Sequence, residues 1–194
     1  SGGGWRHQSL VEISLSIQSI MAIGPVIPVV VIENIDDAIP LADALIEGGI
    51  GTIEITLRSA VALNAIALIS QERPDLTIGA GTVLNPLQMQ AVQEAGADFV
   101  VSPGAYPELL KSARDSGAVF LPGATTASEM MFLLANGLTA MKFFPATVAG
   151  GPEYLKALAS PLADVAFCPT GGITLKTAMD WLSLSNVYCI GGSW

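Results

Sequence analysis

Short apolar runs rich in β-branched residues alternate with amphipathic stretches along the whole chain. The apolar runs have the length of buried strands and occupy residues 26–32, 51–57, 77–83, 99–104, 118–124, 140–146, 166–172 and 187–194. The amphipathic stretches have helical spacing, near residues 36–48, 60–72, 86–95, 106–116, 126–136, 152–160 and 174–184. The pattern therefore predicts eight strands that alternate with seven helices.

Capping signals at both ends of the amphipathic stretches support the helix assignments. We expect Asp36 to cap the first helix, Asn85 to precede Pro86 at a first helical position, and Thr126 to form a capping box with Glu129. Glycines that suit a left-handed helix end follow four of the stretches, at Gly48-Gly49, Gly96, Gly117 and Gly137. These signals predict where each helix begins and ends.

Strands that are apolar on both faces and are joined by crossover helices imply a parallel sheet covered on both sides. Eight such units favour an α/β fold of the (β/α)8 TIM-barrel type. The alternative is a doubly wound open sheet, but the chain has no early GxGxxG turn to support it. We expect an extra helix over residues 10–22 and no final helix after the last strand. Residues 1–8 are interpreted as a flexible leader or cloning remnant, and residues 9–194 as one barrel domain.

Composition narrows the classes of protein to which the chain could belong. Only 13% of the 194 residues are charged, so much of the chain must be buried or lie in subunit contacts. The apolar runs are shorter than the roughly 20 residues of a membrane span, which predicts a protein with no membrane partner. A net charge of −9 with eight scattered basic residues argues against a nucleic-acid partner.

The metal-binding and redox-active residue types are few. His7 is the single histidine, and neither Cys168 nor Cys189 belongs to a CxxC pair, so we expect no metal and no other cofactor. Both cysteines fall in apolar runs with no secretory signal ahead of them, which predicts reduced, buried thiols in a cytoplasmic protein. A disulfide is the alternative, provided that the two strands are neighbours.

Lys142 lies within an otherwise apolar strand, Ala140-Met141-Lys142-Phe143-Phe144-Pro145-Ala146. A lysine buried without a partner tends to become a neutral amine, because the charged form is costly in an apolar environment. A neutral amine is a nucleophile. The alternative is a structural lysine that reaches solvent at the strand end or pairs with a carboxylate.

Glu54 is the other charged residue embedded in an apolar strand. We interpret it as a general acid and base, although it could serve only as an ion-pair partner for Lys142. Arg58 follows the same strand, where its guanidinium could hold the carboxylate of an α-keto acid; alternatively it is a surface arginine at the next helix. In a barrel, the carboxyl ends of the strands carry the working residues, so these side chains should meet.

Glycines follow each of the last two predicted strands, at Gly171-Gly172 and Gly191-Gly192-Ser193. Barrels commonly bind phosphate at this position through backbone N–H groups and a hydroxyl. The glycines could instead merely turn the chain out of each strand. With Lys142, Glu54 and Arg58, they predict Schiff-base chemistry on a phosphorylated keto acid, in which the lysine attacks the keto carbon and a carbon–carbon bond breaks.

A series of segments, in order along the chain, resembles the KDPG/KHG aldolases, which are bacterial class I aldolases of the Entner–Doudoroff pathway. The segments are Gly24-Pro25-Val26-Ile27-Pro28-Val29, Ile53-Glu54-Ile55-Thr56-Leu57-Arg58, Gly79-Ala80-Gly81-Thr82-Val83-Leu84, Ser102-Pro103-Gly104, Lys142-Phe143-Phe144-Pro145-Ala146, Phe167-Cys168-Pro169-Thr170-Gly171-Gly172-Ile173 and Cys189-Ile190-Gly191-Gly192-Ser193-Trp194. The resemblance implies a homotrimeric barrel that cleaves 2-keto-3-deoxy-6-phosphogluconate (KDPG) into pyruvate and glyceraldehyde 3-phosphate.

The resemblance also implies roles for individual residues. Lys142 would form the Schiff base and Glu54 would act as acid and base through a water. The substrate-binding residues would be Arg58 and Thr82 for the carboxylate, Phe144 as a pocket wall, Pro103, and, around the distal phosphate, Thr170, Gly171, Gly172, Gly192 and Ser193.

Two alternatives to cleavage of KDPG stay open from the sequence. One is a related aldolase that acts on 4-hydroxy-2-ketoglutarate (KHG) or on the galactonate epimer of KDPG. The other is a non-catalytic barrel that serves as an oligomeric scaffold.

Overall fold

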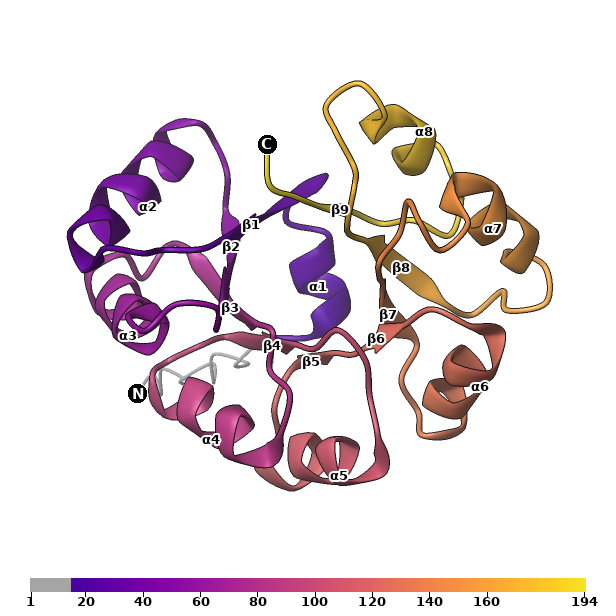
Figure 1. The fold of residues 1–194 in the computed structure, drawn as a ribbon, viewed down its shortest axis with the longest axis horizontal. Coiled ribbons are helices and arrows are strands. Elements are labelled where there is room, and N and C mark those ends of the chain that lie inside the picture. The colour runs from indigo at the N-terminus through magenta and orange to yellow at the C-terminus, as the bar shows by residue number, and fades with distance from the viewer. Residues whose placement is uncertain (1–14) are drawn as a thin grey trace, which may run out of the picture.

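The computed structural model describes residues 15–194, and its strands gather at the centre with most of the helices outside them (Figure 1). The strands are β1 (Val26–Val30), β2 (Thr52–Thr56), β3 (Thr77–Gly81), β4 (Phe99–Val101), β5 (Phe120–Leu121), β6 (Gly123–Ala124), β7 (Ala140–Phe143), β8 (Ala166–Pro169) and β9 (Ile190–Gly192). The helices are α1 (Ile17–Met21), η1 (Ile35–Asp37), α2 (Ala38–Glu47), α3 (Ala62–Glu72), α4 (Pro86–Glu94), α5 (Pro107–Ser116), α6 (Ala127–Ala135), α7 (Gly151–Leu158) and α8 (Ala178–Leu182).

The strands form two sheets in which every pairing is parallel. One sheet has the order β5-β4-β3-β2-β1-β9 and the other the order β6-β7-β8. The predicted strand over residues 118–124 is divided at Pro122 into β5 and β6, which pair with different neighbours. Two isolated parallel bridges, Phe167 to Val187 and Thr170 to Gly191, link the second sheet to the last segment of the first. The parallel α/β architecture that the sequence predicts is confirmed.

The alternation of side chains along the strands separates two hydrophobic layers. On β2, Ile53 and Ile55 belong to the large layer between the strands and the outer helices. The intervening side chain of Glu54 points to the opposite, inner face. A smaller inner layer contains Ile27, Phe99, Val101, Leu121, Ala140, Ala166, Cys168 and Cys189. Charged residues of the strands therefore face the inside of the ring, not the helices.

Helix α1 lies in the middle of the ring as viewed in Figure 1. It packs at the amino ends of the strands, against Phe99, Ala140 and Ala166, which are the first residues of β4, β7 and β8. Ser16 and Ser19 form a capping box that begins the helix, and Ile20 and Met21 are buried in the inner layer. Gln18 donates a hydrogen bond to Thr139, directly before β7, with 3.1 Å between Nε2 and Oγ1. Because α1 covers the amino ends, the opposite, carboxyl ends are left to form a pocket.

Most predicted helix signals are confirmed, with one error at the first helix. Asn85 accepts a hydrogen bond from Gln88, and Thr126 and Glu129 form the expected capping box. Gly49, Gly96, Gly117 and Gly137 have positive φ angles, as left-handed helix ends require, whereas Gly48 does not. The prediction that Asp36 is a cap was wrong: the cap is Asn34, whose side chain accepts from the N–H of Asp36 in the short turn η1.

Other differences concern the ends of the chain. Helix α8 is shorter than the predicted stretch 174–184, and β9 is shorter than the predicted strand 187–194. The predicted helix over 10–22 is present as α1 in its second half, while residues 10–14 and the interpreted leader 1–8 lie outside the described residues. No helix within residues 15–194 has the length and hydropathy needed to cross a bilayer.

The two cysteines lie on neighbouring segments inside the ring, which meets the condition set for a disulfide, but both are free thiols. Cys168 and Cys189 are 2% and 0% exposed. Hydrogen bonding with Cys168, together with burial, raises the pKa of the Cys189 thiol well above its ordinary value. The predicted reduced, buried state is therefore what the structure contains.

Candidate active site

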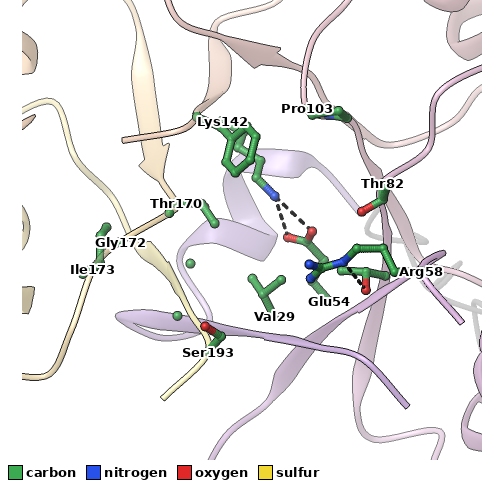
Figure 2. Close-up of a pocket in the computed structure, with 15 residues that line it drawn as sticks. Val29, Glu54, Arg58, Thr82, Pro103, Lys142, Thr170, Gly172, Ile173 and Ser193 are labelled. Carbon is green, nitrogen blue, oxygen red and sulfur yellow. Dashed lines mark hydrogen bonds and ion pairs between the residues drawn. The ribbon is translucent and has the colours of Figure 1, made fainter. Parts of the chain in front are cut away.

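A buried ion pair between Lys142 and Glu54 lies at the centre of the pocket (Figure 2). The Lys142 Nζ atom donates to Oε1 of Glu54 at 3.0 Å and to Oε2 at 3.3 Å. The two residues are 6% and 4% exposed, and they come from β7 and β2, 88 residues apart in sequence. The structure thus brings together the two charges that the sequence analysis singled out, within the distance needed for direct proton transfer.

One glycine of β3, Gly81, makes room for the Glu54 carboxylate. Glu54 pairs with Gly79 in the parallel register, and Gly81 follows on the same inner face. A Cβ atom added at Gly81 would lie 2.1 Å from Oε1 of Glu54, so a larger residue there would displace the carboxylate. Gly81 therefore leaves the space into which the Glu54 side chain extends.

Lys142 reaches the pocket because β7 alternates its side chains strictly. Met141 and Phe143 belong to the outer layer, which leaves the lysine on the inner face between its register partners Gly123 and Cys168. The Nζ atom is 5.6 Å from the centre of the Phe144 ring, close enough for a cation–π contact in the charged state. Phe144 is thus a wall beside the amine, as the resemblance implies.

Arg58 and Thr82 lie on one side of the pocket, to the right of Lys142 in Figure 2. Arg58 follows β2 and donates from Nε to Thr56 Oγ1 at 3.0 Å. Thr82 follows β3 with a φ angle of 60°, an uncommon backbone conformation for a β-branched residue. A guanidinium and a hydroxyl on the same side are suitable partners for a substrate carboxylate.

Glycine-rich turns form the other side of the pocket, where Figure 2 shows Gly172 and Ser193. Gly171 and Gly172 have φ angles of 105° and 75°, which residues with a Cβ atom rarely adopt. A Cβ atom at Gly191 would lie 2.3 Å from Thr170 Oγ1. These positions therefore need glycine. Without side chains there, the backbone can lie close to a ligand on this side of the pocket.

One pocket of about 370 Å³ is lined by every catalytic and substrate-binding residue that the sequence analysis named. The predicted residues that it brings together are Glu54, Arg58, Thr82, Pro103, Lys142, Phe144, Thr170, Gly171, Gly172, Gly192 and Ser193. Sequence reasoning missed three lining residues, Val29, Thr56 and Ile173, and it named Gly191 only as part of the glycine pair before Ser193. Thr56 could have been found, because it has the same strand parity as Glu54.

The arrangement has the components for covalent catalysis on a small keto acid. An amine lies beside a carboxylate that can exchange protons with it, and a cation stands at one side of the same pocket. The volume is in the range of small-molecule sites, which is roughly 300–1,000 Å³. Within residues 15–194, no group of three or more His, Cys, Asp or Glu side chains is arranged to hold a metal ion.

Comparisons with known proteins agree with this chemistry. A family model described as KDPG and KHG aldolase matches residues 17–194. The 2-dehydro-3-deoxy-phosphogluconate aldolase of Dickeya dadantii is 48% identical over 179 residues, which cover 92% of this chain and 84% of the relative.

Solved structures give the same result. The 2-keto-3-deoxy-6-phospho-gluconate aldolase of Zymomonas mobilis superposes with a TM-score of 0.90 at 47% identity, over 93% of this chain and 87% of the other. The KDPG aldolase of Legionella pneumophila, with pyruvate captured as a covalent carbinolamine intermediate, also has a TM-score of 0.90 at 47% identity, over 91% of this chain and 86% of the other. The chain belongs to the KDPG and KHG aldolase family.

Proposed function

We propose that this protein is a class I aldolase that cleaves KDPG into pyruvate and glyceraldehyde 3-phosphate. The observation that carries the proposal is the buried contact between Lys142 Nζ and the Glu54 carboxylate inside the pocket. The relative from Dickeya dadantii is named for the same substrate, and the Legionella pneumophila enzyme holds pyruvate covalently. Both support the transfer of the activity to this chain.

In the proposed reaction, the Lys142 amine attacks the keto carbon of the substrate and forms a carbinolamine. Loss of water, with a proton supplied by Glu54, gives an iminium. The Glu54 carboxylate then takes the proton of the hydroxyl on the carbon that becomes the aldehyde, the carbon–carbon bond breaks, and the iminium accepts its electron pair. The aldehyde product leaves, Glu54 returns its proton to the carbon of the resulting enamine, and water releases pyruvate from the lysine. The iminium is the electron sink, so the scheme requires no metal.

The two sides of the pocket fix the orientation of the substrate in this scheme. Arg58 and Thr82 bind the carboxylate, while the backbone at Gly171, Gly172, Gly192 and Ser193 binds the distal phosphate. Pro103, Phe144 and Thr170 line the walls between the two ends. Thus the keto carbon is held beside Lys142, between the two sides seen in Figure 2.

Steady-state kinetics on three substrates would test the assignment. We expect cleavage of KDPG with a higher kcat/KM than that of KHG or of the galactonate epimer, and an unchanged rate after treatment with EDTA. The phosphate side of the pocket is the physical reason for a preference over KHG, which has no phosphate to bind there. A higher kcat/KM for KHG or for the epimer would show that KDPG is not the preferred substrate. Loss of activity in EDTA would contradict the class I mechanism.

The finer architecture is part of the same proposal. The two parallel sheets form one closed eight-stranded barrel, with β5 and β6 as two halves of one strand and the bridges to Val187 and Gly191 as the closing contact. An experimental structure with β8 and β9 apart would contradict closure.

We also propose that the protein is cytoplasmic and that three copies of the chain form a homotrimer. The free state of both cysteines supports the cytoplasmic location. The trimer is supported by large apolar side chains that a subunit contact could cover, such as Leu87 and Val148, which are 79% and 84% exposed. Light scattering should therefore give three times the 20.0 kDa chain mass. A monomer mass would exclude the trimer.

A further inference from the structure

We propose that Thr56 is a positioning residue that holds the Arg58 guanidinium in place to receive the substrate carboxylate. The inference rests on the proposed function, since it assumes that Arg58 binds the carboxylate. It is carried by a hydrogen-bonded chain that runs from the backbone of β1 to the guanidinium. Neither the family resemblance nor the sequence pattern assigned a task to Thr56.

The Thr56 hydroxyl donates one hydrogen bond and accepts another. Its Oγ1 atom donates to the carbonyl oxygen of Val30 at 3.0 Å and accepts from Arg58 Nε, also at 3.0 Å. Thr56 is 1% exposed and pairs with Gly81 in the sheet, so its position is fixed by the strands on either side. The hydroxyl proton lies on the side of Val30, which orients a lone pair toward Arg58.

Arg58 itself is an exposed residue beyond the end of β2. A free arginine side chain has many rotamers, and ordering one on binding costs conformational entropy. The bond from Nε to Thr56 orders the guanidinium before substrate arrives. Within residues 15–194, its Nη1 and Nη2 atoms form no hydrogen bond or ion pair. These two nitrogens are therefore the pair that remains to bind a carboxylate.

The backbone that carries Arg58 is also fixed on both sides. Ser59 donates from Oγ to the Ile32 carbonyl oxygen at 2.6 Å, and the Leu57 N–H donates to the Gly81 carbonyl oxygen at 2.9 Å. The loop therefore holds the Arg58 backbone, and Thr56 holds the far end of its side chain. Loss of the Thr56 hydroxyl should free the guanidinium without moving Lys142 or Glu54.

Thr56→Val removes the hydroxyl and keeps the shape of the side chain. We expect KM for KDPG, and the pyruvate concentration that half-saturates adduct formation, to rise about tenfold, since a hydrogen bond to a charged group is lost. The value of kcat should stay within about threefold, because the proposed catalytic pair is untouched. Thr56→Ser should restore the parent KM, because it retains the hydroxyl.

Thr52 offers a matched control on the same strand. It is 1% exposed, has the same parity as Thr56, and its hydroxyl has no hydrogen-bond partner among the described residues. It does not line the pocket. Thr52→Val should therefore leave KM at the parent value. A tenfold rise in this variant would show that KM responds to any lost hydroxyl on β2, and it would overturn the inference.

A double-mutant cycle with Arg58→Ala separates this inference from the proposed function. If Thr56 acts through Arg58, Thr56→Val should raise KM in the parent but have no further effect when Arg58 is alanine. If Arg58→Ala leaves KM unchanged, the carboxylate clamp itself is wrong. If Arg58→Ala raises KM but Thr56→Val does not, only the positioning role is overturned. Thr56→Ala removes the same hydroxyl, and its KM decides the question if the valine variant does not fold.

Discussion

Replacing Lys142 with alanine should reduce the kcat for cleavage of KDPG by at least about 10³-fold, because the variant cannot form the covalent intermediate. The residual rate can come only from binding and polarisation of the substrate. The structure gives this prediction a specific form, since Lys142 is the one lysine among residues 15–194 that lines the pocket. Cleavage is measured by the release of pyruvate under saturating substrate.

Lys111→Ala is the matched control for this variant. Lys111 is exposed on α5 and pairs with Asp115 one turn away, a contact of little energetic value. The Lys111→Ala variant should cleave KDPG at the parent rate. Because removal of Lys142 also leaves Glu54 buried without its partner, Lys142→Met and circular dichroism are needed to show that the fold survives. A folded Lys142 variant with more than a tenth of the parent kcat would contradict the proposed mechanism.

Replacing Glu54 with glutamine should lower kcat by about 10²- to 10⁴-fold, the range typical of lost acid–base catalysis. Glutamine has the same shape and can still accept a hydrogen bond from Lys142, but it cannot take up or return the proton. The amine is retained, so slow formation of a pyruvate adduct should persist. The two rates, of cleavage and of adduct formation, therefore need to be measured in the same variant.

Glu153→Gln is the control for the loss of one negative charge. Glu153 is exposed in the first turn of α7, and its nearest cation is Lys156 at 3.8 Å. The Glu153→Gln variant should cleave KDPG and form the pyruvate adduct at the parent rates. If Glu54→Gln retains parent turnover, Glu54 is only the ion-pair partner of Lys142, which is the alternative that the sequence left open. If it loses adduct formation as completely as Lys142→Ala, its task is to hold the amine in place.

The charged part of the site was predictable because strands have a two-residue period. A charge within an otherwise apolar strand stands out, and Lys142 and Glu54 each have apolar neighbours on both sides that turn to the outer layer. The contact between the two residues was not predictable from spacing, since it depends on the side-chain room at Gly81. The position of Val29 and Ile173 in the pocket lining was not predictable either, because in the sequence both look like ordinary core residues.

The fold was predictable for a related reason. Buried parallel strands and capped helices leave local signals, and helices such as α4 and α6 begin where their capping residues indicate. The errors arose where tertiary contacts determine the structure. Pro122 divides one predicted strand between two sheets, and the turn at Asn34 displaces the helix start expected at Asp36.

Trapping with borohydride is the most direct test of the central claim, that Lys142 forms a Schiff base. The protein is incubated with pyruvate and sodium borohydride, digested, and examined by mass spectrometry. We expect one reduced pyruvate adduct on the peptide that contains Lys142, and no adduct in Lys142→Ala. An adduct on another lysine, or none at saturating pyruvate in the folded parent protein, would contradict the account.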